Sequence, residues 1–315
     1  MQASAHSSLL VVNQGDGTLS VVDPVANRQV AAIAEGVPSM VAHEVAASPG
    51  GRLAYLPLYS DVGIGLPGTD GNLMLVVDLE KRQVVDRFDF GRGMRPHCIL
   101  HEPVSRLLYM TTEVDNSITI VDPRTLQTVG SVPTHQEQSH MLAISHDGRR
   151  GYTANVDPGT VSVLDLVNRT FIKIIPIAPI TQRISISNDD SMVFTSDQTT
   201  PRMAVIDTSR NEIEAWIDLP APGYGSASTT DGRLLLVTLP TAHALAVVDL
   251  NTMKTVRTLE IGPRPQQVLV RPDGAVAYVA CYGGHQVAAL DLSRWQITAM
   301  IDVGQKADGM AWAGN

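Results

Sequence analysis

The 315-residue sequence predicts an all-β protein, a seven-bladed β-propeller, from three observations. A phrase of six residues recurs seven times at nearly regular intervals along the chain. Hydrophobic residues make up 44% of the chain, but charged residues only 17% and aromatic residues only 4%, a mixture that suits many short, packed strands better than long helices. The residues near the N-terminus also match a strand that the last repeat lacks, which predicts that the two chain ends meet.

The recurring phrase has the form of a short apolar strand that ends in aspartate. Its copies are TLSVVD, LMLVVD, SITIVD, TVSVLD, RMAVID, ALAVVD and QVAALD, ending at Asp23, Asp78, Asp122, Asp165, Asp207, Asp249 and Asp291. The intervals between these aspartates are 55, 44, 43, 42, 42 and 42 residues. Each unit has room for four short antiparallel strands bounded by turn residues. A period near 42 with four strands per unit is typical of propeller blades, whereas two β-sandwiches would not give six such intervals.

Closure of the ring is predicted from the two ends of the chain. The last unit supplies only an innermost strand, DGMAWAGN, and SSLLVVNQGDG near the N-terminus matches AVAYVACYGGH of the preceding unit. Residues 8–14 are therefore predicted to form the second strand of blade 7, which closes the ring and removes the open sheet edges. The whole chain, residues 1–315, is expected to be a single propeller domain.

Composition and net charge restrict the classes of partner that the protein is expected to bind. The net charge of −9 argues against a nucleic-acid partner, because phosphate binding needs clustered Lys and Arg. No run of about 18 apolar residues is present, so no membrane span is predicted. The start, MQASAHSSLLVV, lacks the features of a signal peptide, but a processed start would look the same. A periplasmic, secreted or cytoplasmic location thus stays open, and a monomer or weak oligomer is expected. Two cysteines make no disulfide framework.

Two groups of known propellers resemble this sequence. SHDGRRGYTANVDPGTVSVLDL and RPDGAVAYVACYGGHQVAALDL resemble the YVTN-type seven-bladed propeller repeats of bacteria, over essentially the whole chain. This resemblance implies the fold and says little about function. RPHCILHE and QSHMLAISHDG also resemble segments of the propeller lactonases, of the 6-phosphogluconolactonase and carboxymuconate-lactonising type. That second resemblance implies histidines near the start of the innermost strands.

Alignment of the repeats on the tyrosine-bearing second strand places a polar residue at the start of every innermost strand. These residues are His43, His97, His140, Gln182, Tyr224, Gln266 and Asp308. Rows two and four residues further on share the same strand face and are mostly apolar, as at Ile99 and Trp312. The first row is therefore predicted to line the mouth of the central channel. His101 lies in an apolar row and is predicted to be a hydrogen-bonded histidine at a blade interface.

Three consecutive positions of this row are histidine. Three histidines with an open position are the pattern of a catalytic metal site, and neutral imidazole is a common ligand for transition metals. We therefore expect His43, His97 and His140 to bind a divalent transition metal (zinc, copper, iron or manganese), with Asp308 as a carboxylate ligand. Three alternatives stay open: substrate binding or acid–base catalysis without metal, a copper or iron redox site, and a polar lining that holds ordered water.

The predicted function is an enzyme, a hydrolase or lyase that opens a small, lactone-like ring. A metal would polarise the carbonyl and generate hydroxide, or a histidine would act as a base. The candidate catalytic residues are His43, His97, His140, Glu44, Arg183 and Tyr224, and Gln182 and Gln266 line the channel. The lactonase resemblance matches His97 and His140 and implies that Arg183 binds an anionic substrate, but His43 departs from that pattern. The alternative is a non-catalytic YVTN-type propeller that binds a ligand or protein on this face.

Loop lengths favour a one-sided site. The stretch SDVGIGLPGTDG, residues 60–71, adds ten residues to the first blade, since Tyr55 and Asp78 are 23 positions apart and Tyr109 and Asp122 only 13. It is expected to be a flap over the channel or an insertion without function. The loops before the three histidines are also longer than the others. The repeated aspartates are assigned to tight turns, and Cys98 to an ordinary strand position.

Overall fold

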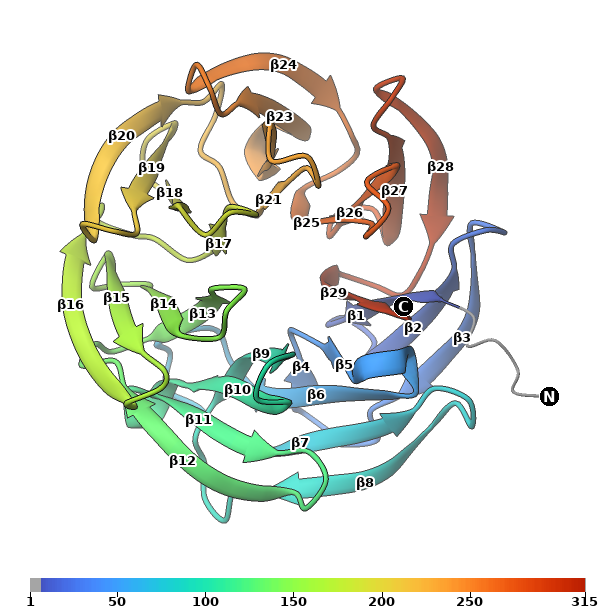
Figure 1. The fold of residues 1–315 in the computed structure, drawn as a ribbon. Helices are drawn as coiled ribbons and strands as arrows, with labels where there is room; N and C mark the ends of the chain where they lie inside the picture. Colours follow the sequence, from blue (N-terminus) through green and yellow to red (C-terminus); the bar gives the residue numbers. More distant parts are fainter. Residues whose placement is uncertain (1–6, 315) are drawn as a thin grey trace.

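The computed structural model describes residues 7–314, which form seven four-stranded antiparallel blades around a central channel (Figure 1). From the innermost strand outward, blades 1 to 3 are β4 (Val41–Ala42) with β5 (Ala46–Ala47), β6 (Leu53–Ser60), β7 (Asp70–Asp78) and β8 (Gln83–Asp89); β9 (Pro96–Glu102), β10 (Leu107–Thr112), β11 (Ser117–Asp122) and β12 (Gln127–Pro133); and β13 (Ser139–Ile144), β14 (Arg150–Asn155), β15 (Thr160–Asp165) and β16 (Thr170–Pro176). The predicted fold class is confirmed.

Blades 4 to 7 repeat this order. They are β17 (Ile184–Ile186), β18 (Met192–Asp197), β19 (Arg202–Asp207) and β20 (Glu212–Asp218); β21 (Ser226–Ser228), β22 (Leu234–Leu239), β23 (Ala244–Asp249) and β24 (Lys254–Glu260); β25 (Pro265–Val270), β26 (Val276–Cys281), β27 (Gln286–Asp291) and β28 (Gln296–Asp302); and β29 (Ala307–Ala313), β1 (Ser8–Asn13), β2 (Thr18–Asp23) and β3 (Arg28–Ala34). The helices of residues 7–314 are three 3₁₀ turns, η1 (Pro49–Gly51), η2 (Glu113–Asp115) and η3 (Pro240–Ala242). None of these turns is long enough to cross a membrane.

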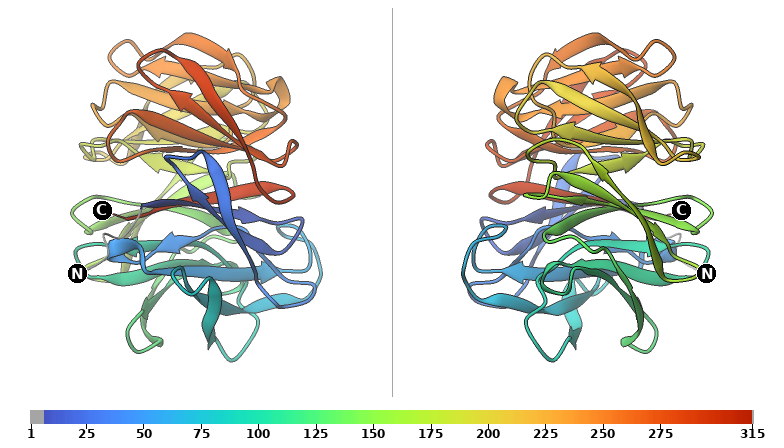
Figure 2. Two further views of the ribbon diagram at one scale, coloured as in Figure 1. Left: turned by 90° about the vertical axis from the view of Figure 1, so that its right-hand side faces the viewer. Right: turned by 90° about the vertical axis from the view of Figure 1, so that its left-hand side faces the viewer.

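The two ends of the chain share blade 7, as predicted. Strand β1 pairs with the C-terminal strand β29 on one side and with β2 on the other, so that Leu9 lies opposite both Trp312 and Val22. Figure 2 shows the red C-terminal strand beside the blue N-terminal strands. Leu10 and Val11 are fully buried against the neighbouring strands and blades. Hydrogen bonds and apolar packing therefore close the ring together.

The repeated aspartates begin tight turns on the outer rim. Asp23 accepts the backbone N–H groups of Val25 and Ala26, at 2.8 and 3.0 Å. An N–H two or three residues later is accepted in the same way by Asp78, Asp122, Asp165, Asp207, Asp249 and Asp291. The assignment of these residues to structure is confirmed.

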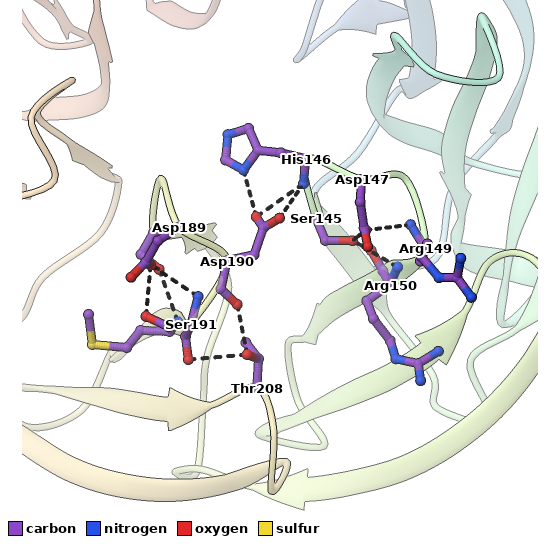
Figure 3. A network of polar contacts seen from close by, with 11 residues as sticks. Ser145, His146, Asp147, Arg149, Arg150, Asp189, Asp190, Ser191 and Thr208 are labelled. Atoms are coloured by element: carbon purple, nitrogen blue, oxygen red, sulfur yellow. Dashed lines mark hydrogen bonds and ion pairs between the residues drawn. The ribbon is translucent and has the colours of Figure 1, made fainter.

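A second set of polar contacts joins neighbouring blades on one face of the disc (Figure 3). The turn after β13 meets the turn after β17, where Asp190 accepts the backbone N–H of His146 at 2.8 Å and contacts its ring Nδ1 at 2.6 Å. The turn itself is fixed by the Ser145 hydroxyl, which donates to Asp147 at 2.6 Å. These turns follow the ends of the innermost strands, so they lie on the face opposite the predicted histidine ring.

Candidate functional site

The three predicted histidines lie together at the mouth where the innermost strands begin. His97 is the second residue of β9, His140 is the second residue of β13, and His43 lies between β4 and β5. The ring centroids of His97 and His140 are 3.5 Å apart, and those of His43 and His97 are 5.0 Å apart. His97 and His140 are each 2% exposed, and His43 is half-buried. Consecutive blades thus bring the three imidazoles into one cluster, called here the histidine cluster.

Tyr59 completes the histidine cluster and was missed in the sequence. Its ring centroid lies 5.2 Å from those of His43 and His97 and 6.0 Å from that of His140, and its side chain is fully buried. The tyrosine reaches this position because β6 has eight residues where β10 has six. The sequence feature that could have indicated Tyr59 is its spacing: it is a second tyrosine, four residues after Tyr55, in the blade with the insertion.

The imidazoles of the cluster are neutral near physiological pH. Burial, together with the positive charge of Arg183, lowers the pKa of His43 from 6.5 to about 4. Burial also holds the pKa values of His97 and His140 well below the usual value of 6.5, and repulsion from neighbouring protonated histidines acts in the same direction. Neutral imidazole is the form that binds metals and accepts protons.

Two buried nitrogens of the cluster have no hydrogen-bond partner. Gln14 Nε2 lies 3.0 Å from His43 Nδ1, and Gln182 Nε2 lies 3.3 Å from His140 Nε2, so each amide can donate to a ring nitrogen. The Nδ1 atoms of His97 and His140 are buried, and neither makes a hydrogen bond to a protein atom. A buried polar atom without a partner costs about 1–3 kcal/mol, so these two nitrogens favour a ligand.

The cluster is compact, but the rings are not arranged around a common point. Within residues 7–314, no group of three or more His, Cys, Asp and Glu side chains is placed to hold a metal ion. The rings of His97 and His140 lie face against face, tilted by 32°. Binding of one ion by three ring nitrogens, at about 2.0–2.2 Å each, would require these rings to turn, and it stays a prediction.

A buried arginine crosses the channel beside the histidine cluster. Arg183 comes from blade 4, which lies opposite blades 1 and 7 in the ring (Figure 1). Its Nη1 lies 2.7 Å from Glu44 Oε1 of blade 1, and its Nη2 lies 2.8 Å from Asp308 Oδ1 of blade 7. The three side chains are only 5–6% exposed. This group, called here the channel bridge, joins opposite sides of the propeller.

Burial controls the charges of the channel bridge. It raises the pKa of Glu44 to about 7 and also raises the pKa of Asp308, while the guanidinium of Arg183 opposes both shifts. Gln14 Nε2 donates to the second oxygen of Asp308, and the Tyr282 hydroxyl donates to Gln14 Oε1 at 3.2 Å. Gln14 therefore connects the channel bridge to the histidine cluster, a role that no pattern in the sequence indicated.

The remaining predicted site residues surround the channel bridge and the cluster. The Tyr224 ring centroid lies 5.2 Å from Arg183 Cζ, and Gln266 is 8% exposed in the same row. Both Nη atoms of Arg183 are engaged by carboxylates, and its role toward an anionic substrate stays a prediction. The metal-binding role of Asp308 and the catalytic roles of Glu44 and Tyr224 also stay predictions.

Two residues of β9 outside the cluster were assigned from the sequence. Cys98 is buried, and its Sγ contacts the carbonyl oxygen of Leu142 at 3.8 Å, which confirms an ordinary strand position at a blade interface. His101 lies toward the other end of β9 and is half-buried, and burial lowers its pKa. His101 is therefore remote from the cluster and serves as a control.

Glu35 supports the segment that carries His43. One backbone hydrogen bond recurs where each blade's outermost strand ends, and the residues that donate it are Glu35, Phe90, Thr134, Ile177, Leu219, Ile261 and Val303. Glu35 is the charged member of this set, yet it is 2% exposed. Its Oε2 accepts the N–H of Ala42 at 3.1 Å, while its Oε1 is buried without a hydrogen-bond partner. The carboxyl group therefore fixes the residue that precedes His43.

Glu35→Gln is expected to weaken the pH dependence of stability. Burial raises the pKa of Glu35 from 4.5 to about 7, so the folded state binds the proton more tightly than the unfolded state. The stability from this group is present below pH 4.5 and is lost as the pH rises through 7. The free energy of unfolding, measured in urea at pH 5 and pH 8, should differ between the two pH values by about 1–3 kcal/mol less in Glu35→Gln than in the wild type. Glu260→Gln, at an exposed position, should leave the difference unchanged, and an unchanged difference in Glu35→Gln would contradict the assignment.

Fold and site together define the class of this protein: a seven-bladed β-propeller with a histidine cluster at one mouth of its channel. No family model matches the chain. The chain is weakly similar to the uncharacterized protein YncE of Salmonella typhi and of Salmonella typhimurium, with 23% identity over 211 residues, or 64% of this chain. The match spans 60% of the length of these relatives.

Three solved structures share the architecture. Hydrazine synthase of Kuenenia stuttgartiensis has a TM-score of 0.78 with 18% identity, covering 92% of this chain and 94% of that one. A chain of the mitotic checkpoint complex has a TM-score of 0.73 with 13% identity, covering 88% and 82%. The dihydro-heme d1 dehydrogenase NirN in complex with DHE has a TM-score of 0.69 with 15% identity, covering 100% and 77%. At these identities the likeness shows the fold alone.

Proposed function

We propose that His43, His97 and His140 bind one divalent transition-metal ion at the channel mouth. The observation that supports this most is the pair of buried, unpartnered Nδ1 atoms on His97 and His140, beside a third neutral imidazole. A metal would accept lone pairs that no protein donor meets, and neutral histidine is its common ligand. Rotation of the stacked rings would present one nitrogen from each blade to the ion.

The chemistry proposed for this site is hydrolytic or eliminative opening of a small, lactone-like ring. An ion with three histidine ligands retains an open position, where it can polarise a carbonyl and lower the pKa of a bound water molecule. Solvent reaches the mouth, because His43, Gln182 and Tyr224 are all half-buried. The channel bridge, in which Arg183 contacts both Glu44 and Asp308, fills the space beside the cluster and limits access of water from the other mouth.

A second candidate is a non-catalytic propeller that binds a ligand or protein partner on the same face. It is favoured by an open pocket beside the flap, whose lining includes none of the three histidines. Metal content separates the two candidates, because only the first requires an ion.

Single substitutions of the cluster are expected to remove the metal. His43→Ala, His97→Ala and His140→Ala should each weaken zinc binding at least about tenfold, because loss of a ligand costs no less than loss of a supporting residue. The measurement is zinc stoichiometry after equilibrium dialysis, by inductively coupled plasma mass spectrometry, paired with hydrolysis rates on a panel of lactones. His101→Ala should bind zinc like the wild type. Wild-type protein that binds no zinc, copper, iron or manganese would overturn the proposal, as would equal metal content in all four variants.

A further inference from the structure

The flap, residues 61–69 between β6 and β7, has a defined position on the face that carries the histidine cluster. The Arg95 guanidinium donates to the carbonyl oxygen of Leu66 at 2.7 Å and to Asp70 Oδ1 at 2.5 Å. The backbone at Gly65 lies so close to Gln138 of blade 3 that a Cβ there would be 2.6 Å from its Nε2. The flap thus leaves and re-enters blade 1, is held by Arg95 from the start of blade 2, and reaches Gln138 of blade 3 at Gly65.

An open pocket of about 440 Å³ lies beside the flap. Its lining includes Leu66, Pro67, Arg95, Glu113, Val114 and Glu137. A volume of this size falls within the range of small-molecule sites, roughly 300–1,000 Å³. The insertion builds one wall of the pocket, and the other blades lack an insertion of this length.

One side of the pocket is apolar and faces water. Leu66 is 57% exposed and Val114 is 45% exposed, and Pro67 lies next to Leu66 in the same wall. Covering these side chains with an apolar group would remove that surface from water, which is favourable. A ligand for this pocket therefore carries a short hydrocarbon portion.

The other side of the pocket has an excess of negative charge. Arg95 pairs with Asp70, and the other charged side chains of the lining are the carboxylates of Glu113 and Glu137, so the lining holds one basic and three acidic side chains. Glu113 is 6% exposed and accepts a hydrogen bond from the Tyr59 hydroxyl, while Glu137 is exposed. Burial raises the pKa of Glu113, and the hydrogen bond from Tyr59 and the positive charge of Arg95 oppose this shift. A cation beside these carboxylates would offset the cost of burying Glu113.

We propose that this pocket binds a small organic cation, a primary alkylammonium, with its charged end between Glu113 and Glu137 and its alkyl chain against Leu66 and Val114. The site is separate from the histidine cluster and does not depend on a bound metal. Tyr59 connects the two, because its ring packs on the three histidines and its hydroxyl donates to Glu113. A ligand that contacts Glu113 in the pocket would therefore contact the hydrogen-bond partner of Tyr59.

The test compares two probes of equal length and opposite charge, n-butylammonium and butyrate, by NMR titration of the isotopically labelled full chain. The expected result is weak, saturable binding of n-butylammonium, with shifts at Leu66, Glu113 and Val114, and no binding of butyrate. Glu137→Gln and Glu113→Gln should each weaken n-butylammonium binding about fivefold, the effect of one partly exposed charge pair. Glu80→Gln, an exposed control in a turn on the opposite face, should have no effect.

Other outcomes overturn the proposal. Butyrate binding equal to or stronger than n-butylammonium binding would make the pocket an anion site centred on Arg95. Unchanged n-butylammonium affinity in both glutamine variants would show that the probe binds elsewhere. Glu137 is exposed, so Glu137→Gln should fold normally and gives a result even if Glu113→Gln does not fold. Absence of binding by either probe at about 100 mM, where even a dissociation constant near 10 mM would saturate the pocket, would also exclude an alkylammonium site. None of these results bears on metal binding at the histidine cluster.

Discussion

A chain that begins at Gly15, without residues 1–14, is expected to lose its cooperative unfolding transition. The deletion removes β1, in which Leu9, Leu10, Val11 and Val12 are all 0% exposed. Burial of four such side chains contributes about 6–12 kcal/mol, as large as the whole stability of a typical domain. The deletion also leaves the facing edges of β29 and β2 unpaired, and such edges promote association. Thermal unfolding by circular dichroism, with size-exclusion chromatography, measures both effects.

Rescue in trans distinguishes a missing strand from general damage. A synthetic peptide of residues 7–14 should restore a cooperative transition to the truncated chain, because it supplies the pairing partner of β29 and β2. A peptide in which Leu10 and Val12 are replaced by aspartate keeps the length and serves as the control. Unchanged melting of the truncated chain without any peptide would contradict closure of the ring by β1.

Arg183→Met is expected to lower the free energy of unfolding by about 3–5 kcal/mol, the usual cost of breaking a buried ion pair from one side. Methionine fills a similar volume but leaves Glu44 and Asp308 buried without a cation. Arg52→Met is the matched control, since its side chain is 71% exposed and its nitrogen lies 3.9 Å from Asp78. That variant should change stability by less than about 1 kcal/mol in urea denaturation.

The loss in Arg183→Met should also depend on pH. Burial already raises the pKa of Glu44 to about 7, and removal of the guanidinium leaves this shift unopposed. A carboxyl whose pKa is higher in the folded state contributes stability at low pH and loses it as the pH rises through the folded pKa. The destabilisation should therefore be larger at pH 8 than at pH 5. When Glu44→Gln and Asp308→Asn are combined with Arg183→Met, most of the lost free energy of unfolding should be recovered at pH 8. An equal loss at both pH values would show that the carboxylates are not the cause.

The architecture was predictable because the strand pattern of one blade recurs seven times in the sequence. Each strand pattern recurs with an aspartate that turns the chain, as at Asp23, so one misjudged segment is corrected by six others. The ring closure was predictable for the same reason, since a missing strand in the last repeat has to be supplied by the first residues. The repeat also placed His43, His97 and His140 on equivalent positions, and the structure brings them together.

The contacts across the channel were not predictable in the same way. A repeat aligns equivalent positions but carries no information about which side chain is long enough to reach an opposite blade, as Arg183 does. Tyr59 belongs to the second strand of blade 1, and Gln14 directly follows the second strand of blade 7, positions to which the repeat assigned no functional role. Their contacts with the cluster depend on how far the strands extend, and therefore on the irregular features of blades 1 and 7. The positions of Tyr59 and Gln14 could therefore be inferred only from the features in which blades 1 and 7 differ from the other blades.

The pairing of β1 with β29 also determines when this protein can finish folding during synthesis. Leu9 pairs with Trp312, so β1 leaves the ribosome long before the strand that completes its pairing. At a synthesis rate of roughly 5–20 residues per second, the edge of β1 stays unpaired for about 15 to 60 s. Throughout that interval the nascent chain carries an apolar strand with a free hydrogen-bonding edge, which other chains and chaperones can bind. Slower translation lengthens the exposure, so the yield of native protein depends on elongation rate as well as on final stability.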